Sequence, residues 1–245
     1  MDNVTSIALS RLVAQQRATD VTAANLANAA TPGFHAERVV FSDWLVKARG
    51  TAISSNGTIA FTQDRATYRD PLPGPLQHTV NPLDFAIGGD GYFSVQTANG
   101  VRLTRAGHFS TSKNGEIVDG QGNALLTVTG GRLRLGPTDR DITVAGDGTM
   151  STSNGQIGRI GIVKPDNDQT LRAEGGQLSS SSTPTKPVAA PKLIQGAIEN
   201  SNIQPVLELT RMMTDLREFQ FTSELVQAEA DRQHSAIEKL IQTRS

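Results

Sequence analysis

Apolar residues recur with heptad spacing along the C-terminal end of the chain. The positions on this spacing are Leu209, Met212, Leu216, Phe219, Ser223, Val226, Ala230, Gln233, Ile237 and Leu240, and only Ser223 and Gln233 are polar. Many charged residues lie between these positions, so one face of the predicted helix is apolar and the opposite face is hydrated. The pattern predicts a long helix over residues 205–241 that packs against another helix.

This helix is long compared with the body of the protein. At ~1.5 Å per residue it spans roughly 55 Å, whereas a compact chain of this length has a radius of gyration of about 18 Å. Pro205 suits the first turn of a helix, and Ser201 and Asn202 are candidate caps. We therefore expect the helix to project from the body and to contact other helices.

A second helix is predicted at the N-terminus, over residues 3–30. Its apolar residues include Leu9, Leu12 and Leu26, but polar residues interrupt the periodicity. Thr31-Pro32-Gly33 ends the helix, because proline disfavours the α conformation in the preceding residue and Pro-Gly suits a type II turn. The two terminal helices could pair with each other, with other subunits, or with both; the simplest alternative is a hairpin that closes one globule.

The middle of the chain, residues 83–163, has the alternation of β-strands. Apolar and polar residues alternate at 83–87, 93–96, 101–104 and 132–135, so each segment is expected to have one hydrated face. The dipeptides that favour tight turns are Asn99-Gly100, Asn114-Gly115, Asp119-Gly120, Gly130-Gly131, Asp147-Gly148 and Asn154-Gly155. Short strands at this spacing predict an antiparallel sandwich or barrel-like domain.

Two less regular segments join these parts. Residues 35–82 contain several prolines after position 70 and predict an extended connector with one or two short strands, for instance at 59–61. Residues 164–192 are rich in serine and proline and predict a flexible return loop.

The predicted fold class is therefore α+β, with long N- and C-terminal helices that pack as a coiled coil, a central antiparallel all-β domain and an extended β connector. The domains are residues 1–34, 35–82, 83–192 and 193–245.

Composition and motifs predict neither catalysis nor a cofactor. The net charge is −1, which gives no field for nucleic acid, and the absence of cysteine removes thiolate chemistry. The four histidines are scattered, and no metal-binding, nucleophile or phosphate-loop motif accompanies them. Gly88-Gly89-Asp90-Gly91 is followed by a strand pattern and is interpreted as a turn. We predict no catalytic, cofactor-binding or metal site.

Targeting signals are also missing from the pattern. Residues 1–20 lack the apolar run of a secretory signal, and no stretch approaches a membrane span. Composition alone would place the protein in the cytoplasm.

Three motifs resemble those of the flagellar basal-body rod and hook proteins. Residues 20–34 are similar to the family's N-terminal pattern D-x-x-A-x-N-x-A-N-x-x-T-x-G-F, through Asp20, Ala23, Asn25, Ala27, Asn28, Thr31, Gly33 and Phe34. Residues 195–206 resemble the G-x-L-E-x-S-N-V entry to the C-terminal helix, with Ile198 and Ile203 in place of Leu and Val. Residues 83–95 and 104–109 look like L-D-x-A-I-x-G-x-G-F-F-x-V and T-R-x-G-x-F; Tyr92 and Leu103 depart from it but stay apolar.

The resemblance implies a structural subunit of the flagellar rod. Its partners would be other copies, other rod proteins and the flagellar type III export apparatus, without nucleic acid or membrane insertion, and export would need no cleaved signal. The length and the start of the chain resemble proximal rod members; a distal rod protein and, from another class, a coiled-coil-stalked β adhesin are the alternatives. The expected subunit-interface residues are Leu9, Leu12, Asn25, Leu26, Asn28, Leu209, Met212, Leu216, Phe219, Val226, Ile237 and Leu240.

Overall fold

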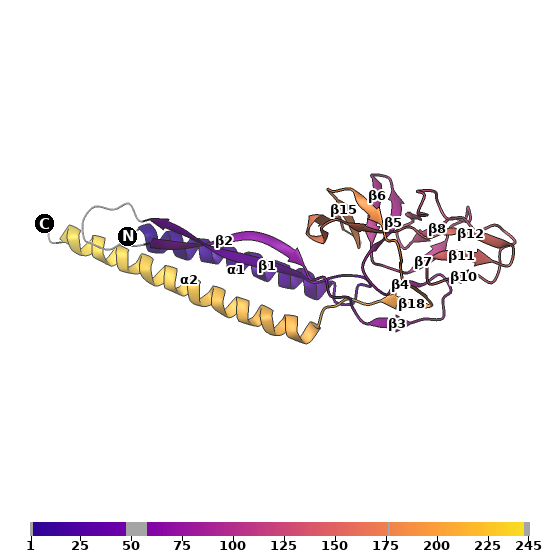
Figure 1. Cartoon of the computed structure of the whole chain (residues 1–245). Helices are drawn as coiled ribbons and strands as arrows, with labels where there is room; N and C mark the ends of the chain where they lie inside the picture. The colour runs from indigo at the N-terminus through magenta and orange to yellow at the C-terminus, as the bar shows by residue number, and fades with distance from the viewer. Residues whose placement is uncertain (1, 48–57, 176, 243–245) are drawn as a thin grey trace. The chain divides into compact units, whose positions relative to one another are not determined.

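A computed structural model describes residues 2–47, 58–175 and 177–242, and the chain divides into two compact units (Figure 1). Unit 1 comprises Met1–Ala27, Glu37–Tyr68 and Gln204–Ser245. Unit 2 comprises Asn28–Ala36 and Arg69–Ile203. The chain thus crosses between the units several times, and each unit is built from segments distant in sequence.

Unit 1 contains both α-helices of the described chain. Helix α1 is Asp2–Ala27 and helix α2 is Pro205–Gln242, close to the residue ranges that the two periodic patterns indicate. The helices pack along each other, and a two-stranded sheet of β1 (Glu37–Lys47) and β2 (Thr58–Arg69) adjoins them, with β1 against α1.

The prediction of only short strands in the connector is wrong. Strands β1 and β2 are 11 and 12 residues long, and they pair with each other. Val39, Val40 and Ile59 are among the β-branched residues that favour extended backbone, and the pairing satisfies the backbone hydrogen bonds. The prolines that suggested an irregular segment all follow residue 70.

Unit 2 is made of short antiparallel strands, so the predicted α+β class with an antiparallel body is confirmed. The strands are β3 Leu76–His78, β4 Phe85–Ile87, β5 Tyr92–Thr97, β6 Gly100–Thr104, β7 Phe109–Thr111, β8 Ile117–Asp119, β9 Ala124–Leu125, β10 Thr143–Val144, β11 Thr149–Thr152, β12 Gly155–Arg159, β13 Ile162–Pro165, β14 Leu171–Ala173, β15 Leu178–Ser181, β16 Thr185–Pro187, β17 Leu193–Gln195 and β18 Ala197–Glu199. The largest sheet has the order β14-β15-β6-β5-β9-β8-β7, with β13 and β16 beside β5; β10-β11-β12, β17-β4 and β18-β3 form smaller sheets.

Aromatic residues form the centre of the unit 2 core. The Phe109 ring lies 5.9 Å from the Phe85 ring and 5.4 Å from the Phe93 ring, and it meets Phe93 edge-on. The predicted hydrated face of residues 83–87 is wrong, because Asp84 and Ala86 are also buried. Asp84 is tolerated there because Thr79 and Asn81 donate hydrogen bonds to its carboxylate.

Five of the six predicted turns have a glycine with positive φ, namely Gly100, Gly115, Gly130, Gly148 and Gly155. The sixth is displaced: Gly122, not Gly120, has the positive φ, and Asp119 accepts the amide hydrogens of Gln121 and Asn123.

The prediction of a flexible loop over residues 164–192 is wrong for much of that segment. Strand β15 pairs with β6, where Leu178 lies opposite Thr104, and β16 pairs with β13. Serine has a low intrinsic preference for strands, but an available sheet edge overrides that preference.

Candidate functional site

The α2 residues that are shielded from solvent also have heptad spacing. At every second position, however, the shielded residue is the one just before the residue of the predicted row. The shielded row consists of Glu208, Met212, Asp215, Phe219, Thr222, Val226 and Glu229, and we call it the α2 seam. Ala230, beside Glu229, is partly shielded as well. The shielded residues of the predicted row are therefore Met212, Phe219, Val226 and Ala230, whereas its Leu209, Leu216 and Ser223 are exposed.

Polar partners explain the displacement. The Asp215 carboxylate accepts from the Thr22 hydroxyl at 3.4 Å, and the Glu208 carboxylate accepts from the Asn25 amide at 3.4 Å. Glu208 also pairs with Arg38 of β1 at 2.8 Å. A buried carboxylate without such partners would be costly, so the polar residues take the inner positions and leave the leucines outside.

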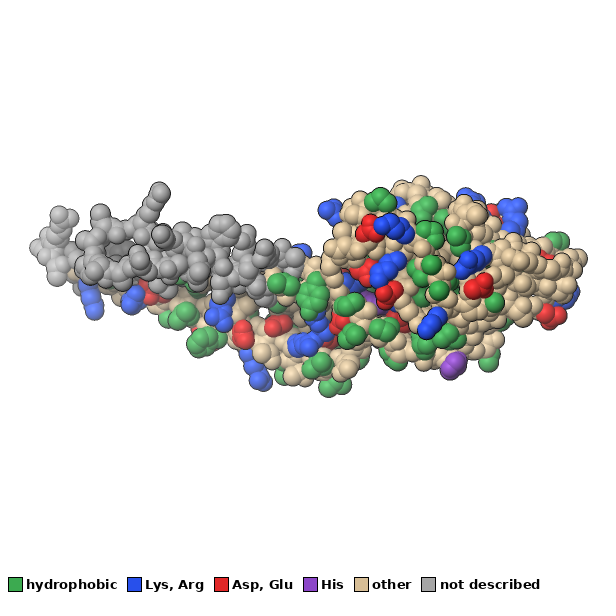
Figure 2. Space-filling model, viewed as in Figure 1, with side chains coloured by type: hydrophobic (Ala, Val, Ile, Leu, Met, Phe, Trp, Pro, Cys, Tyr) green, Lys and Arg blue, Asp and Glu red, His purple; other side chains and the backbone are tan. Residues whose placement is uncertain are grey.

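Exposed apolar residues consequently lie along the helix pair, and Figure 2 shows some of this apolar surface in green on one face of it. The exposed apolar residues of the described part of unit 1 include Val206, Leu209, Met213, Leu216, Phe221 and Leu225 of α2 and Leu9 and Val13 of α1. A groove of about 510 Å³ is lined by Leu12, Val13 and Phe219 among others. A second groove, of about 390 Å³, has Ile7, Phe221 and Leu225 in its lining. Exposed apolar surface of this extent is typical of a binding face.

The predicted interface residues differ in their accessibility. Leu9, Leu209 and Leu216 are exposed, and partial exposure is shared by Leu12, Leu26, Asn28, Met212, Phe219 and Val226. The side chains of Ile237 and Leu240 lie outside the described residues.

Asn25 is buried within unit 1. Its side chain is 1% exposed and exchanges two hydrogen bonds with the backbone of Glu37: the amide nitrogen donates to the carbonyl at 2.8 Å, and the amide oxygen accepts from the N–H at 2.9 Å. Asn25 therefore fixes the start of β1 on α1 within one chain.

Asp215 is the carboxylate of the α2 seam whose ionisation is disfavoured. Burial raises its pKa above the ordinary value, Glu218 and Glu208 add to the rise, and the Thr22 hydrogen bond and Arg211 oppose it. A raised pKa in the folded state means that ionised Asp215 weakens the helix pair at neutral pH, and that protonation relieves this cost as the pH falls.

We expect Asp215→Asn to stabilise unit 1 at neutral pH. The advantage over wild type should disappear below about pH 4, the ordinary range of an aspartate, because wild-type Asp215 is then protonated as well. Both α-helices belong to unit 1, so thermal unfolding followed by helical circular dichroism at several pH values measures the effect. Asp231→Asn, at an exposed position of α2, is the control; an equal gain there would contradict the role of Asp215.

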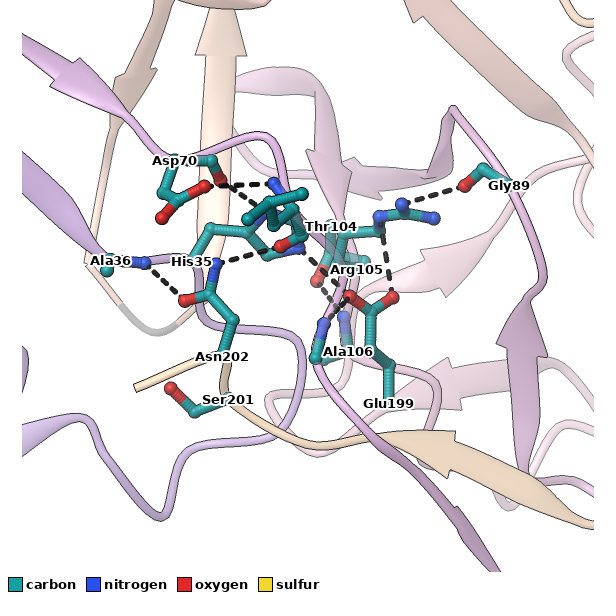
Figure 3. A network of polar contacts seen from close by, with 12 residues as sticks. His35, Ala36, Asp70, Gly89, Thr104, Arg105, Ala106, Glu199, Ser201 and Asn202 are labelled. Carbon is teal, nitrogen blue, oxygen red and sulfur yellow. Dashed lines mark hydrogen bonds and ion pairs between the residues drawn. The ribbon is translucent and has the colours of Figure 1, made fainter. Parts of the chain in front are cut away.

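Unit 2 contains a buried polar centre at which the three motifs meet (Figure 3). Glu199 Oε1 accepts from Gly74 N–H at 3.0 Å and lies 3.0 Å from His35 Nε2, and Glu199 Oε2 lies 3.5 Å from Arg105 Nε. The Glu199 carbonyl accepts from Gly33 N–H at 2.7 Å. One glutamate thus ties residues 33–35, 74 and 105 together.

The Asn202 side chain makes hydrogen bonds to backbone groups beside this polar centre. Its side-chain oxygen accepts from Ala36 N–H at 2.8 Å, its amide donates to the Leu72 carbonyl at 2.8 Å, and its backbone N–H donates to Phe34. The expected capping of α2 by Asn202 is therefore wrong, since its side chain is engaged within unit 2. The Ser201 hydroxyl accepts from Ile203 N–H, ahead of α2.

Glu199 is held ionised by these partners. Burial of the side chain, which is 1% exposed, would raise its pKa, but the His35 hydrogen bond, the Arg105 charge and the Gly74 N–H outweigh burial and lower the pKa below the ordinary value. The stability that ionised Glu199 contributes is present above about pH 4.3 and is lost as the pH falls through its lowered pKa. Sequence reasoning missed this centre, although Arg105 and Glu199 are motif residues and His35 follows one.

No group of three histidine, aspartate or glutamate side chains among the described residues is placed to hold a metal ion. Neither α1 nor α2, over the residues described, is apolar enough to cross a membrane.

Comparison with known proteins gives consistent matches along the whole chain. The family models are "Flagella basal body rod protein" over residues 6–35, "Flagellar hook protein FlgE/F/G D1 domain" over 86–171 and "Flagellar basal body rod FlgEFG protein C-terminal" over 194–238. The flagellar basal-body rod protein FlgF of Caulobacter vibrioides is 34% identical over 98% of both chains. FlgF of Mesorhizobium japonicum is 33% identical over 96% of both, and FlgF of Salmonella typhimurium is 31% identical over 84% of this chain and 85% of its own.

Proposed function

The chain belongs to the family of flagellar basal-body rod proteins, and from this premise we propose how its helices serve the rod. It is a structural subunit of the rod, of the FlgF-like, proximal kind. The proposal is that helix pairs of successive copies, and of other rod proteins, pack as coiled coils in an inner tube. Unit 2 decorates that tube, and the stiff polymer transmits motor torque.

The observation that supports this proposal is the presence of apolar residues on both flanks of the α2 seam. By helical periodicity, Leu209 and Leu216 lie on one flank, and Phe221 and Leu225 lie on the other. A subunit with two different binding faces associates head to tail, which generates a helical polymer when the ring does not close.

We also propose where in the flagellum the subunit lies. The family relatives support the flagellar basal body, and we propose that the subunit lies where the rod crosses the periplasm. Export by the flagellar type III apparatus, without a cleaved signal, belongs to the same proposal, as does the absence of catalytic, cofactor-binding and nucleic-acid-binding roles.

Electron cryo-microscopy of isolated basal bodies tests the architecture. Density for α1 and α2 lining the inside of the rod, at the level of the proximal segment, is the expected result. Helices on the outside of the rod would contradict the inner-tube proposal. A distal position would favour the distal-rod alternative, and a protein found on the cell surface would favour the adhesin.

We expect the helices to be the least protected part of the free monomer. Four of the seven α2 seam residues, namely Glu208, Asp215, Thr222 and Glu229, are polar, so little apolar surface is buried between the helices. Packing supplies most of the stability of a helix. Hydrogen exchange on dilute protein should be fast in α1 and α2 and slow in β5 and β6. Protection of the helices equal to that of β5, in a verified monomer, would show that the pair is stable without neighbours.

A further inference from the structure

The two flanks of the α2 seam both carry apolar side chains, but they differ in shape. On the Leu216 flank, the exposed side chains of Leu209, Met213 and Leu216 follow one another at spacings of four and three residues. We call these three residues the ridge. On the other flank, the groove of about 390 Å³ has the exposed side chains of Phe221 and Leu225 in its lining. One helix pair thus presents a ridge on one side and a groove on the other.

The most buried residues of this groove are small. Ala8 of α1 and Thr222 of α2 line it and are 7% and 5% exposed, whereas Phe221 and Leu225 in the same lining are 71% and 52% exposed. Small buried residues between large exposed ones form the kind of hole that takes an apolar knob of another helix in a coiled coil. The ridge of the same chain lies on the opposite flank of α2, so a helix of another molecule must supply the knobs.

The groove also carries a positive charge that its own chain leaves unbalanced. Arg217 lines the groove, and among the described residues it has neither a hydrogen-bond nor an ion-pair partner. Arg11, in the same lining, lies 3.8 Å from Glu218 and is paired with it. A partner that brings a carboxylate to Arg217 would complement this flank.

The ridge side carries an unbalanced negative charge. Asp20 of α1 lines the second groove together with Phe219, which places it on the same side of the seam as the ridge. Its carboxylate accepts from the neutral Gln16 amide at 3.0 Å, and no ion pair of Asp20 is found among the described residues. Arg17, in the same lining, has an interaction of its own. Unlike flanks therefore attract each other, whereas like flanks would bring equal charges together.

We propose that the groove of each subunit takes the ridge of a second copy, with Asp20 of the ridge subunit facing Arg217 of the groove subunit. The contact is head to tail, because each copy in it keeps one free ridge or one free groove for the next copy. This inference rests on the proposed rod function and adds to it which two surfaces meet and that the partner is the same chain.

Charge exchange in the full chain tests the pairing in cells. Asp20→Arg and Arg217→Asp should each reduce swimming and the number of completed rods, because like charges then meet in the contact. The double variant restores opposite charges and should recover much of the loss. Asp20→Arg with Arg172→Asp is the matched control, since it restores the same net charge at an exposed residue of β14 in unit 2 and should recover nothing. No recovery in the first double variant, or equal recovery in the control, would refute the pairing.

The chain has no cysteine, so two introduced thiols report the contact directly. Met213→Cys with Leu225→Cys places one thiol on the ridge and one at the groove, roughly 18 Å apart along α2 and beyond the reach of a short thiol cross-linker. Applied to isolated basal bodies, the cross-linker should give a ladder of covalent multimers. Met213→Cys with Val101→Cys, whose second thiol is on exposed β6 of unit 2, is the matched control and should give no ladder.

The outcomes separate this inference from the rod function. Completed rods that contain the Met213–Leu225 pair but give no ladder would overturn the ridge-and-groove contact and leave the rod function standing. Cross-links to a different rod protein in place of the ladder would overturn the choice of a second copy. Absence of the wild-type chain from isolated rods would overturn the rod function itself. Where the double-cysteine variant does not assemble, the charge exchange still decides.

Discussion

Leu216→Asp is expected to abolish motility while leaving both units folded. Leu216 is 43% exposed in the free chain, so a carboxylate at this position remains hydrated and costs the monomer little. In the proposed rod the same side chain is buried against a neighbouring helix, where an unpaired charge costs several kcal/mol per subunit. Because every copy in the polymer carries the change, the cost is repeated along the tube.

Swimming assays on cells that carry the variant in place of wild type measure this effect. Circular dichroism of the purified variant should match wild type, and no rod should be completed. Val101→Asp is the matched control, because it makes a similar apolar-to-acidic change at a residue of β6 that is 52% exposed, in unit 2, which the proposal places outside the tube. Motile cells with Leu216→Asp, or equal loss with Val101→Asp, would contradict packing through the Leu216 flank.

Phe219 shows what changes when the structure is added to the sequence. The heptad row placed Leu216 and Phe219 on one predicted packing face, but in the structure Phe219 is part of the α2 seam and Leu216 is outside it. The helix itself was predictable because its period is a local property. Which flank is inside depends on Arg38 and Asn25, distant in sequence, which pair with Glu208 and draw that carboxylate inward.

The same division between local and distant causes applies to the β unit. The turns at Asn99-Gly100 and Asn154-Gly155 were predictable, because a tight turn depends on its own dipeptide. The strand at 178–181 was not, because only its pairing with β6 makes a serine run extended. The Glu199 centre brings together residues between positions 33 and 202. These residues are far apart in sequence, so no periodic pattern along the chain predicts that they are in contact. The resemblance marked Arg105 and Glu199 as motif residues without indicating that they meet.

Gly107 carries the largest stability effect that we expect in unit 2. It lies in the motif Thr104-Arg105-Ala106-Gly107-His108-Phe109, and its own backbone crosses that of Phe85 closely. A Cβ atom at this position would lie 1.7 Å from the Phe85 carbonyl oxygen and 2.8 Å from the carbonyl carbon. Neither chain can move away easily, because Phe85 N–H donates to the Gly107 carbonyl at 2.9 Å and the Phe85 and Phe109 rings are both buried in the core.

Gly107→Ala should therefore lower the free energy of unfolding of unit 2 by about 3 kcal/mol or more. This is the upper end of the destabilisation caused by a larger side chain in a packed region, because no side-chain rotation relieves a clash with backbone. Gly120→Ala is the matched control: it makes the same substitution where a Cβ would meet nothing within 4 Å, and its effect should stay within about 0.5 kcal/mol. Urea unfolding of the three proteins gives the comparison. If Gly107→Ala unfolded at the wild-type midpoint, the close approach of residues 85 and 107 would not exist in solution. A large loss at Gly107 alone would explain why this motif has glycine between an arginine of the polar centre and a phenylalanine of the core.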